Sequence, residues 1–277
     1  MRWSLPEFIL ELQKDPLRKV LFVEGGRDIS IWKFIVPVSA RNNGVIYPIS
    51  SLECEPGAGG ERGRLMRSAS TIYKTGVHED RVRFFADADA DRLLGKSAEV
   101  NVTLTDGRDL ESYGLVASSL ERFCEIGFPS KADTASSVIK LLEAVVRPLG
   151  VLRVASDRNG LKLPFQRTFE GKGIGRFIDQ ASSSLDLERL LKTLLQNATM
   201  GLRELGRIRQ LLDEENARLQ ALPLNQLAHG KDVTLLLAWR FGISQFEAER
   251  LLFMALSAEP ELLTKGSIGQ IRSWLVT

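Results

Sequence analysis

Three short apolar runs that end in acidic residues constrain the fold of this chain more than any other feature of its sequence. The runs span residues 20–23, 82–86 and 100–104, and the acids that follow them are Glu24, then Asp87 and Asp89, then Asp106, Asp109 and Glu111. Each run is short and rich in β-branched or aromatic residues, which predicts a strand. If these strands share one sheet, their acids predict a cluster of carboxylates at one end of it.

The segments between the runs have helical patterns, so strands and helices are expected to alternate. We expect strands at 19–23, 45–49, 82–86 and 100–104, and helices at 4–14, 27–36 and 61–75. This alternation is typical of βαβ units in a mainly parallel, Rossmann-like sheet with helices on both faces. Ligands bind beyond the carboxyl ends of the strands in such sheets, which is where the acids are predicted to lie.

The character of the sequence changes near residue 116, where helical patterns become dominant. We expect helices at 116–126, 131–147, 174–184, 186–197, 201–221, 231–240, 244–256 and 266–276. One apolar run, residues 150–155, resembles a strand. We therefore predict an α/β domain over residues 1–115 and a mostly helical domain over residues 116–277, which would serve dimerisation or the binding of a substrate or partner.

Composition excludes several classes of protein. No stretch approaches the roughly 18 consecutive apolar residues of a membrane span. The two cysteines, Cys54 and Cys124, form no CxxC motif, so neither a zinc site nor a disulfide framework is indicated. The net charge is +2 and no basic tail is present, so any nucleic-acid binding would need a local basic face or a metal. We expect a cytoplasmic protein that does not enter the membrane.

The predicted carboxylate cluster indicates a site for a hard divalent cation, Mg²⁺ with Mn²⁺ as the alternative. Such cations prefer oxygen ligands, and they offset the repulsion among clustered acids and between those acids and phosphate. We expect Glu24, Asp87 and Asp89 to be catalytic residues and metal ligands, with Glu24 acting as a ligand or as the general acid/base. The chemistry that fits this set is metal-assisted attack on a phosphodiester bond.

The Asp-x-Asp sequence has three other interpretations. An EF-hand loop beginning at Asp87 requires Gly and Glu where Arg92 and Ala98 stand, so it is excluded. A phosphotransferase of the haloacid-dehalogenase type expects Thr or Val where Asp91 stands. A solvated acidic turn after a strand is the plain structural alternative.

Four further residues have both a functional and a structural interpretation. Asp28 is either a ligand of a second metal or an acid at a helix N-terminus. Glu111 is a further candidate metal ligand, whereas Asp109 is expected to cap a helix that the two residues open. Lys231 could stabilise transition-state charge, but it could equally be a surface residue at a helix start.

Basic residues on the predicted helix 61–75 are candidates for nucleic-acid binding. Arg62, Arg64 and Arg67 could follow a phosphate backbone, or they could form the exposed face of that helix. Asn159 and Lys162 are placed near the site from the second half of the chain.

The motifs together resemble those of the toprim domain, which topoisomerases, primases, recombination proteins and OLD-family nucleases share. The resemblance covers residues 18–115 and rests on Glu24-Gly25-Gly26-Arg27-Asp28, on Asp87-Ala88-Asp89 and on residues 109–113 (Asp-Leu-Glu-Ser-Tyr). Within this group the chain is most similar to OLD-like nucleases, in particular the AriB subunits of PARIS anti-phage systems. Residues 159–165 and 229–232 resemble the same group less specifically.

This resemblance implies a Mg²⁺-dependent nuclease that acts as the toxin of a bacterial defence system. The implied substrate is RNA, most specifically tRNA, and the implied partner is an ABC-type ATPase that restrains the nuclease until a phage triggers release. The implied active form is a homodimer. Glu24 would be the essential acid/base or ligand, and Asp87 and Asp89 would bind the metal.

Two rival functions stay open. One is cleavage of DNA by the same site, and the other is a non-catalytic toprim module that binds nucleic acid or an ATPase. A topoisomerase is disfavoured because 277 residues leave no room for large strand-passing domains. A primase is disfavoured because the sequence has no zinc-binding set of Cys and His.

Overall fold

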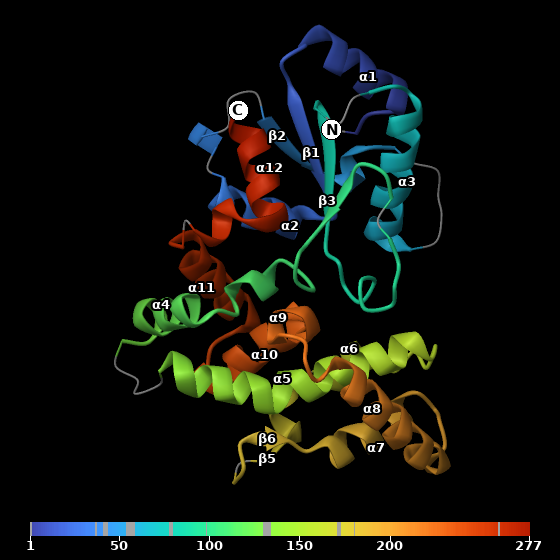
Figure 1. Cartoon of the computed structure of the whole chain (residues 1–277), viewed down its shortest axis with the longest axis vertical. Helices are drawn as coiled ribbons and strands as arrows, with labels where there is room; N and C mark the ends of the chain where they lie inside the picture. Colours follow the sequence, from blue (N-terminus) through green and yellow to red (C-terminus); the bar gives the residue numbers. More distant parts are fainter. Residues whose placement is uncertain are drawn as a thin grey trace. The chain divides into compact units, whose positions relative to one another are not determined.

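The computed structural model forms two compact units, each built from separate segments of the chain (Figure 1). It describes residues 2–36, 38–40, 44–53, 59–77, 80–97, 99–129, 134–170, 173–179, 181–259 and 261–277. The first unit comprises Met1–Ala88, Ser97–Asp106 and Glu259–Thr277, and the second comprises Asp89–Lys96 and Gly107–Ala258. The sequence predicted a single division after residue 115 instead; Cys54 and Ala98, named above, lie outside the described residues.

A four-stranded parallel sheet organises the first unit, as the alternation of strands and helices predicted. Its strands are β1 (Lys19–Val23), β2 (Gly44–Pro48), β3 (Val82–Ala86) and β4 (Val102–Leu104), in the order β2-β1-β3-β4. In the pairing of β1 with β3, Phe22 lies opposite Phe84 and Val23 opposite Phe85. Pro48 ends an edge strand, where a missing backbone donor is tolerated.

Helices cover both faces of this sheet because successive strand residues point to opposite sides. On one face, α1 (Leu5–Lys14) and α3 (Gly60–Lys74) pack over stacked rings of Phe22 and Phe84, whose centroids are 5.4 Å apart. On the other face, Trp32 of α2 (Gly26–Ile35) meets Phe85 edge-on at 5.0 Å. The buried aromatic pairs therefore fix the two helical layers against the strands.

The C-terminal helix α12 (Gly266–Val276) also belongs to the first unit. The indole Nε1 of Trp274 donates to the carbonyl of Asp80 at 2.9 Å, and Lys19 Nζ donates to the carbonyl of Trp274 at 3.0 Å. The Cα of Gly44 lies so close to Leu275 that a Cβ would be 2.9 Å from its carbonyl oxygen. These long-range contacts explain why the predicted division at residue 115 does not describe the first unit.

The second unit is mostly helical, as expected. Its α-helices are α4 (Ala117–Gly127), α5 (Ala135–Arg158), α6 (Phe165–Phe169), α7 (Leu187–Asn197), α8 (Leu205–Leu219), α9 (Leu224–Leu227), α10 (Gly230–Phe241) and α11 (Gln245–Ser257). Short 3-10 helices are η3 (Glu111–Gly114), η4 (Ile174–Phe177) and η5 (Leu202–Glu204); η1 (Val38–Ala40), η2 (Ile49–Ser51) and η6 (Leu262–Thr264) belong to the first unit. Leucine and valine side chains of α5, α7 and α10 supply much of its core.

Two sequence predictions in this unit were wrong. The apolar run 150–155 is not a strand but part of α5, whose apolar residues point to all sides because neighbouring helices surround it. The predicted helix 174–184 is instead η4 followed by a two-stranded hairpin of β5 (Ile178–Asp179) and β6 (Ser184–Leu185). The carboxylate of Asp179 accepts hydrogen bonds from two backbone N–H groups of the connecting turn, which favours the hairpin over a helix.

Close packing of α5 against α9 predicts an unusual response to a glycine substitution. A Cβ on Gly150 would lie 2.4 Å from the carbonyl oxygen of Leu227, which is backbone and cannot rotate away. We expect Gly150→Ala to lower the free energy of unfolding by about 1–3 kcal/mol, although Ala normally favours a helix. Gly206 in α8 has no neighbouring atom within 4 Å, so Gly206→Ala is the matched control.

The control is expected to stabilise the protein by up to about 1 kcal/mol. Urea unfolding of the two variants measures both effects, and equal responses would contradict the close approach of α5 and α9.

None of the helices that the structure describes combines the length and the apolar character needed to cross a membrane.

Candidate functional site

Two of the predicted site residues lie at the same end of the parallel sheet. Glu24 follows the last residue of β1 and Asp87 follows the last residue of β3, and these two strands are neighbours. Arg62 of α3 bridges them, because its Nη1 lies 3.4 Å from Glu24 Oε1 and also donates to the carbonyl oxygen of Asp87. The fold thus brings together two acids that are 63 positions apart in the sequence.

Two other acids of the first unit have structural roles at the starts of helices. Asp28 Oδ2 accepts a hydrogen bond of 2.8 Å from the backbone N–H of Gly25 and thereby caps the start of α2. Asp106 Oδ2 accepts hydrogen bonds from the backbone N–H and the hydroxyl of Ser267, at 2.8 and 3.1 Å. These contacts agree with the structural interpretation of Asp28, and they assign Asp106 to the start of α12.

The second aspartate of the Asp-x-Asp sequence opens the second unit and has an unusual backbone conformation. Asp89 has a φ of +48°, in the left-handed region that few residues other than glycine adopt. Its N–H donates to the carbonyl oxygen of Arg108 at 2.6 Å, which fixes the turn. Asp91 is half-buried and lies 3.3 Å from the ammonium group of Lys96. The turn is therefore a constrained structure and not merely a solvated loop.

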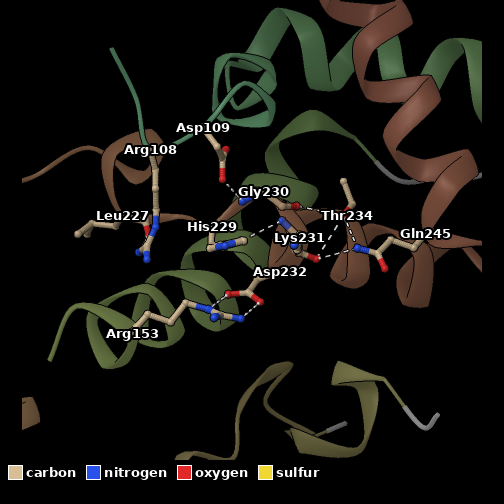
Figure 2. Close-up of polar contacts among 10 residues, drawn as sticks. All are labelled: Arg108, Asp109, Arg153, Leu227, His229, Gly230, Lys231, Asp232, Thr234 and Gln245. Atoms are coloured by element: carbon tan, nitrogen blue, oxygen red, sulfur yellow. Dashed lines mark hydrogen bonds and ion pairs between the residues drawn. The ribbon is translucent and has the colours of Figure 1, made fainter. Parts of the chain in front are cut away.

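Buried acids meet the N-terminus of α10 in the second unit. Asp109 accepts hydrogen bonds from the N–H of Ser112 at 3.1 Å and from the N–H of Gly230, toward which Figure 2 shows it pointing. Asp109 thus binds a backbone N–H in the first turn of the segment that follows it, which is the 3-10 helix η3 and not the predicted α-helix. A Cβ on Gly230 would be 2.6 Å from the carboxyl carbon of Glu111. Burial, then the neighbouring Glu111, raises the pKa of Asp109 well above its usual value.

A buried ion pair lies on the opposite side of this helix start. Arg153 of α5 binds Asp232 of α10 through two parallel hydrogen bonds of 2.6 and 2.7 Å (Figure 2). The Asp232 side chain is fully buried, and the guanidinium of Arg153 also lies 4.3 Å from the ring centre of Phe165. Such a two-point contact fixes the orientation of both side chains.

His229 lies between these groups and caps α10 (Figure 2). Its Nδ1 accepts a hydrogen bond of 3.1 Å from the N–H of Lys231, so the proton of the neutral ring is on Nε2. The pKa of His229 is lowered to about 3, mainly by burial; Asp232 opposes this shift, whereas the nearby charges of Arg153 and Arg108 add to it. His229 is thus a neutral hydrogen-bond donor at physiological pH.

These groups surround a pocket of about 590 Å³ that lies within the second unit. Its lining includes Asp89, Asp91, Lys162, Arg108, Arg153 and His229. Lys162 has a φ of +50°, so two of the non-glycine lining residues, Asp89 and Lys162, have left-handed backbone. We call this the second-unit pocket. Lys162 lines it, whereas Asn159 ends α5 and donates its side-chain amide to the carbonyl of Ala155.

The remaining candidates are exposed or paired locally. Lys231 is an exposed residue in the first turn of α10, as its structural interpretation predicted. Arg64 lies 3.4 Å from Glu61 one turn earlier, and the part-buried Arg67 lines a different pocket, of about 420 Å³, in the first unit. Among the described residues, no group of three or more His, Cys, Asp and Glu side chains is arranged to hold a metal ion.

Sequence reasoning did not identify Arg108 or Arg153 as site residues. Neither belongs to a local motif, and the carboxylate that holds Arg153 is 79 positions away. The only local signals are Asp109, adjacent to Arg108, and the His229–Asp232 segment that the resemblance included.

The pKa of His229 predicts how stability depends on pH. Because the unfolded His binds a proton below about pH 6.5 and the folded His only near 3, its contribution to stability is lost as pH falls through this interval. The slope is at most about 1.4 kcal/mol per pH unit. His229→Asn keeps an acceptor for the helix start but does not titrate. As the pH is lowered from 7 to 4, we expect the free energy of unfolding of the wild type to decrease relative to that of His229→Asn, as measured by urea unfolding.

Asp109 acts in the opposite direction, because its raised pKa makes its contribution fall as pH rises above its ordinary value. It is present in both proteins, so the comparison isolates His229. A stability difference that is independent of pH would contradict the burial of this ring.

No protein-family model matches the sequence. No curated protein matches it at a significant level either. The resemblance to toprim nucleases therefore depends on the motifs, and the functional proposal depends on those motifs and on the geometry described above.

Proposed function

We propose that this chain is a Mg²⁺-dependent nuclease with a toprim-type catalytic unit. The observation that carries the proposal is the placement of Glu24 and Asp87 after neighbouring strands of one parallel sheet. In sheets of this kind the carboxyl ends of the strands are the usual location of ligands and catalytic groups. The alternative interpretation, a solvated acidic turn, does not explain why two acids that are distant in sequence directly follow neighbouring strands.

The available oxygen donors fit a magnesium ion. Mg²⁺ is commonly held by one or two protein carboxylates, with waters and substrate phosphates completing its shell, so Glu24 and Asp87 suffice as protein ligands. Asp89 follows Asp87 by two positions and is the next candidate ligand. When bound, the ion would polarise the phosphoryl group and lower the pKa of an attacking water.

Residues of the chain have distinct tasks in this proposal. Glu24 would accept the proton of the attacking water or orient that water. Arg62, which lies 3.4 Å from Glu24, would orient this carboxylate and supply positive charge near the phosphate. Arg64 and Arg67 follow on the same helix, where they could contact the backbone of the nucleic acid.

The substrate and cellular role come from the resemblance alone. We propose RNA, with tRNA as the first candidate, cleaved in the cytoplasm by the toxin of an anti-phage system. A homodimer as the active form and an ABC-type ATPase as the controlling partner are parts of the same proposal.

The test is to incubate the purified chain with total tRNA and with plasmid DNA, in Mg²⁺, in Mn²⁺ and in EDTA. Cleavage of tRNA alone that EDTA abolishes is the expected result. Cleavage of plasmid alone would replace RNA with DNA as the substrate. Inertness of the free chain on both substrates, combined with binding to nucleic acid, would overturn catalysis in favour of a binding module, in which Arg62 and Glu24 form only a structural ion pair.

A further inference from the structure

The second-unit pocket is lined by several hydrogen-bond donors, one of which is deeply buried. Arg108 lines it and is 3% exposed, with its Nη1 donating to the carbonyl of Leu227 at 2.9 Å. The Nε–H of Arg108 has no hydrogen-bond partner among the described residues. A buried guanidinium N–H without an acceptor destabilises the folded state. An anionic oxygen bound in this pocket would supply the missing acceptor.

The charged groups around Arg108 leave room for a further anion. Burial is the largest cause that lowers the pKa of Arg108, and the guanidinium of Arg153 lowers it further, although the nearby carboxylates of Asp109, Asp232 and Asp89 act in the opposite direction. The carboxylate of Asp232 is already used by Arg153 in two hydrogen bonds. Asp109 is held by backbone N–H groups, and its pKa is raised, so a proton on it would remove its charge. An anion in the pocket would relieve the repulsion between the two guanidinium groups.

Two further donors line the same space. His229 is neutral and carries its proton on Nε2, because its Nδ1 is an acceptor for the helix start. Lys162 is exposed and lines the pocket as well. Together with Arg108 they provide guanidinium, imidazole and ammonium donors from three separate segments, a set that suits the several oxygens of one phosphate group.

The acidic residues of the pocket indicate that a ligand bound through its phosphate would also carry hydroxyl groups. Asp91 is offset by Lys96 at 3.3 Å, whereas Asp157 is exposed near the end of α5. Carboxylates repel phosphate but accept hydrogen bonds from hydroxyl groups. A volume of about 590 Å³ falls in the range of small-molecule sites and exceeds the needs of an isolated phosphate ion.

We propose that the second-unit pocket binds the terminal phosphate of a nucleotide, with Arg108, His229 and Lys162 on the phosphate and the acids facing the ribose hydroxyls. This goes beyond the proposed nuclease function, since it concerns binding within the second unit and requires no metal. A free mononucleotide and the 5′ end of an RNA share this chemistry.

The experiment is a binding titration of the full chain in EDTA, which prevents metal-dependent cleavage. Adenosine 5′-monophosphate, adenosine and inorganic phosphate are compared by calorimetry. RNA decamers with a 5′-phosphate or a 5′-hydroxyl are compared by fluorescence anisotropy. We expect the monophosphate to bind at least about 10-fold more tightly than adenosine, because a single additional hydrogen bond to a charged group is enough for a ratio of this size.

Variants assign the site. Lys162→Ala is expected to weaken the binding of the monophosphate about 3- to 10-fold. The variant should remain folded, because Lys162 is exposed. Arg108→Gln is expected to weaken this binding more strongly, and circular dichroism shows whether the variant is folded. Lys192→Ala, an exposed lysine of α7 that pairs with Glu188, is the control and should bind as wild type does.

The outcomes separate the sources of the ligand. Preference for the phosphorylated decamer supports an RNA end, whereas binding of the monophosphate alone supports a free nucleotide. Equal binding of adenosine and its monophosphate, binding of inorganic phosphate only, or wild-type affinity in Lys162→Ala would overturn the proposal. None of these results depends on Glu24 or on cleavage, so they leave the nuclease proposal to its own assay.

Discussion

Replacing Glu24 with Gln is expected to reduce the rate of tRNA cleavage by about 10²- to 10⁴-fold, the range that a general acid or base contributes. The amide has nearly the same shape but can neither accept the proton of water nor bind a cation as strongly as a carboxylate does. Asp87→Asn should reduce the rate by a similar factor, because an amide binds a cation less strongly than a carboxylate does. The measurement is the initial rate with Mg²⁺ on labelled tRNA.

Stability measurements distinguish this effect from a structural one. The Glu24 and Arg62 side chains are 25% and 20% exposed, so their ion pair should be worth less than about 1 kcal/mol. Glu61→Gln removes another acid near α3, one that is exposed and pairs with Arg64, and it should leave the rate unchanged. If Glu24→Gln and Asp87→Asn both cleave tRNA as wild type does, the catalytic assignment is wrong.

Replacing Asp232 with Ala is expected to lower the free energy of unfolding by about 3–5 kcal/mol. The Asp232 side chain is completely buried, and its removal leaves the guanidinium of Arg153 without its two acceptors in a site that is 15% exposed. The cost comes mainly from this uncompensated buried charge. Urea or thermal unfolding followed by circular dichroism measures it.

Two controls test the cause. Glu188→Ala removes an exposed carboxylate of the same unit, and it should cost less than about 1 kcal/mol. A double variant, Arg153→Met with Asp232→Leu, removes both charges and should regain part of the loss. A loss below 1 kcal/mol in Asp232→Ala would contradict the burial of the pair.

The sequence was sufficient for the features that depend on local pattern. The strands at 19–23 and 82–86 were predicted with the bounds of β1 and β3, because short apolar runs closed by Gly or Asp have one plausible secondary structure. The placement of Glu24 and Asp87 at one end of a parallel sheet followed from the alternation of strands and helices. The prediction for 150–155 failed because a helix buried on all sides loses the periodicity that identifies it.

Tertiary structure decided the features that depend on distant partners. Asp106 seemed equivalent to Glu24 and Asp87 in sequence, but its carboxylate accepts hydrogen bonds from Ser267, 161 positions later, at the start of α12. The pocket residues Arg108 and Arg153 carry no motif, and their roles arise from helices that pack side by side and exclude water from their charges. A sequence therefore predicts where a strand ends in an acid, whereas only the packed chain determines which acids and bases are buried, which are paired and which still lack a partner.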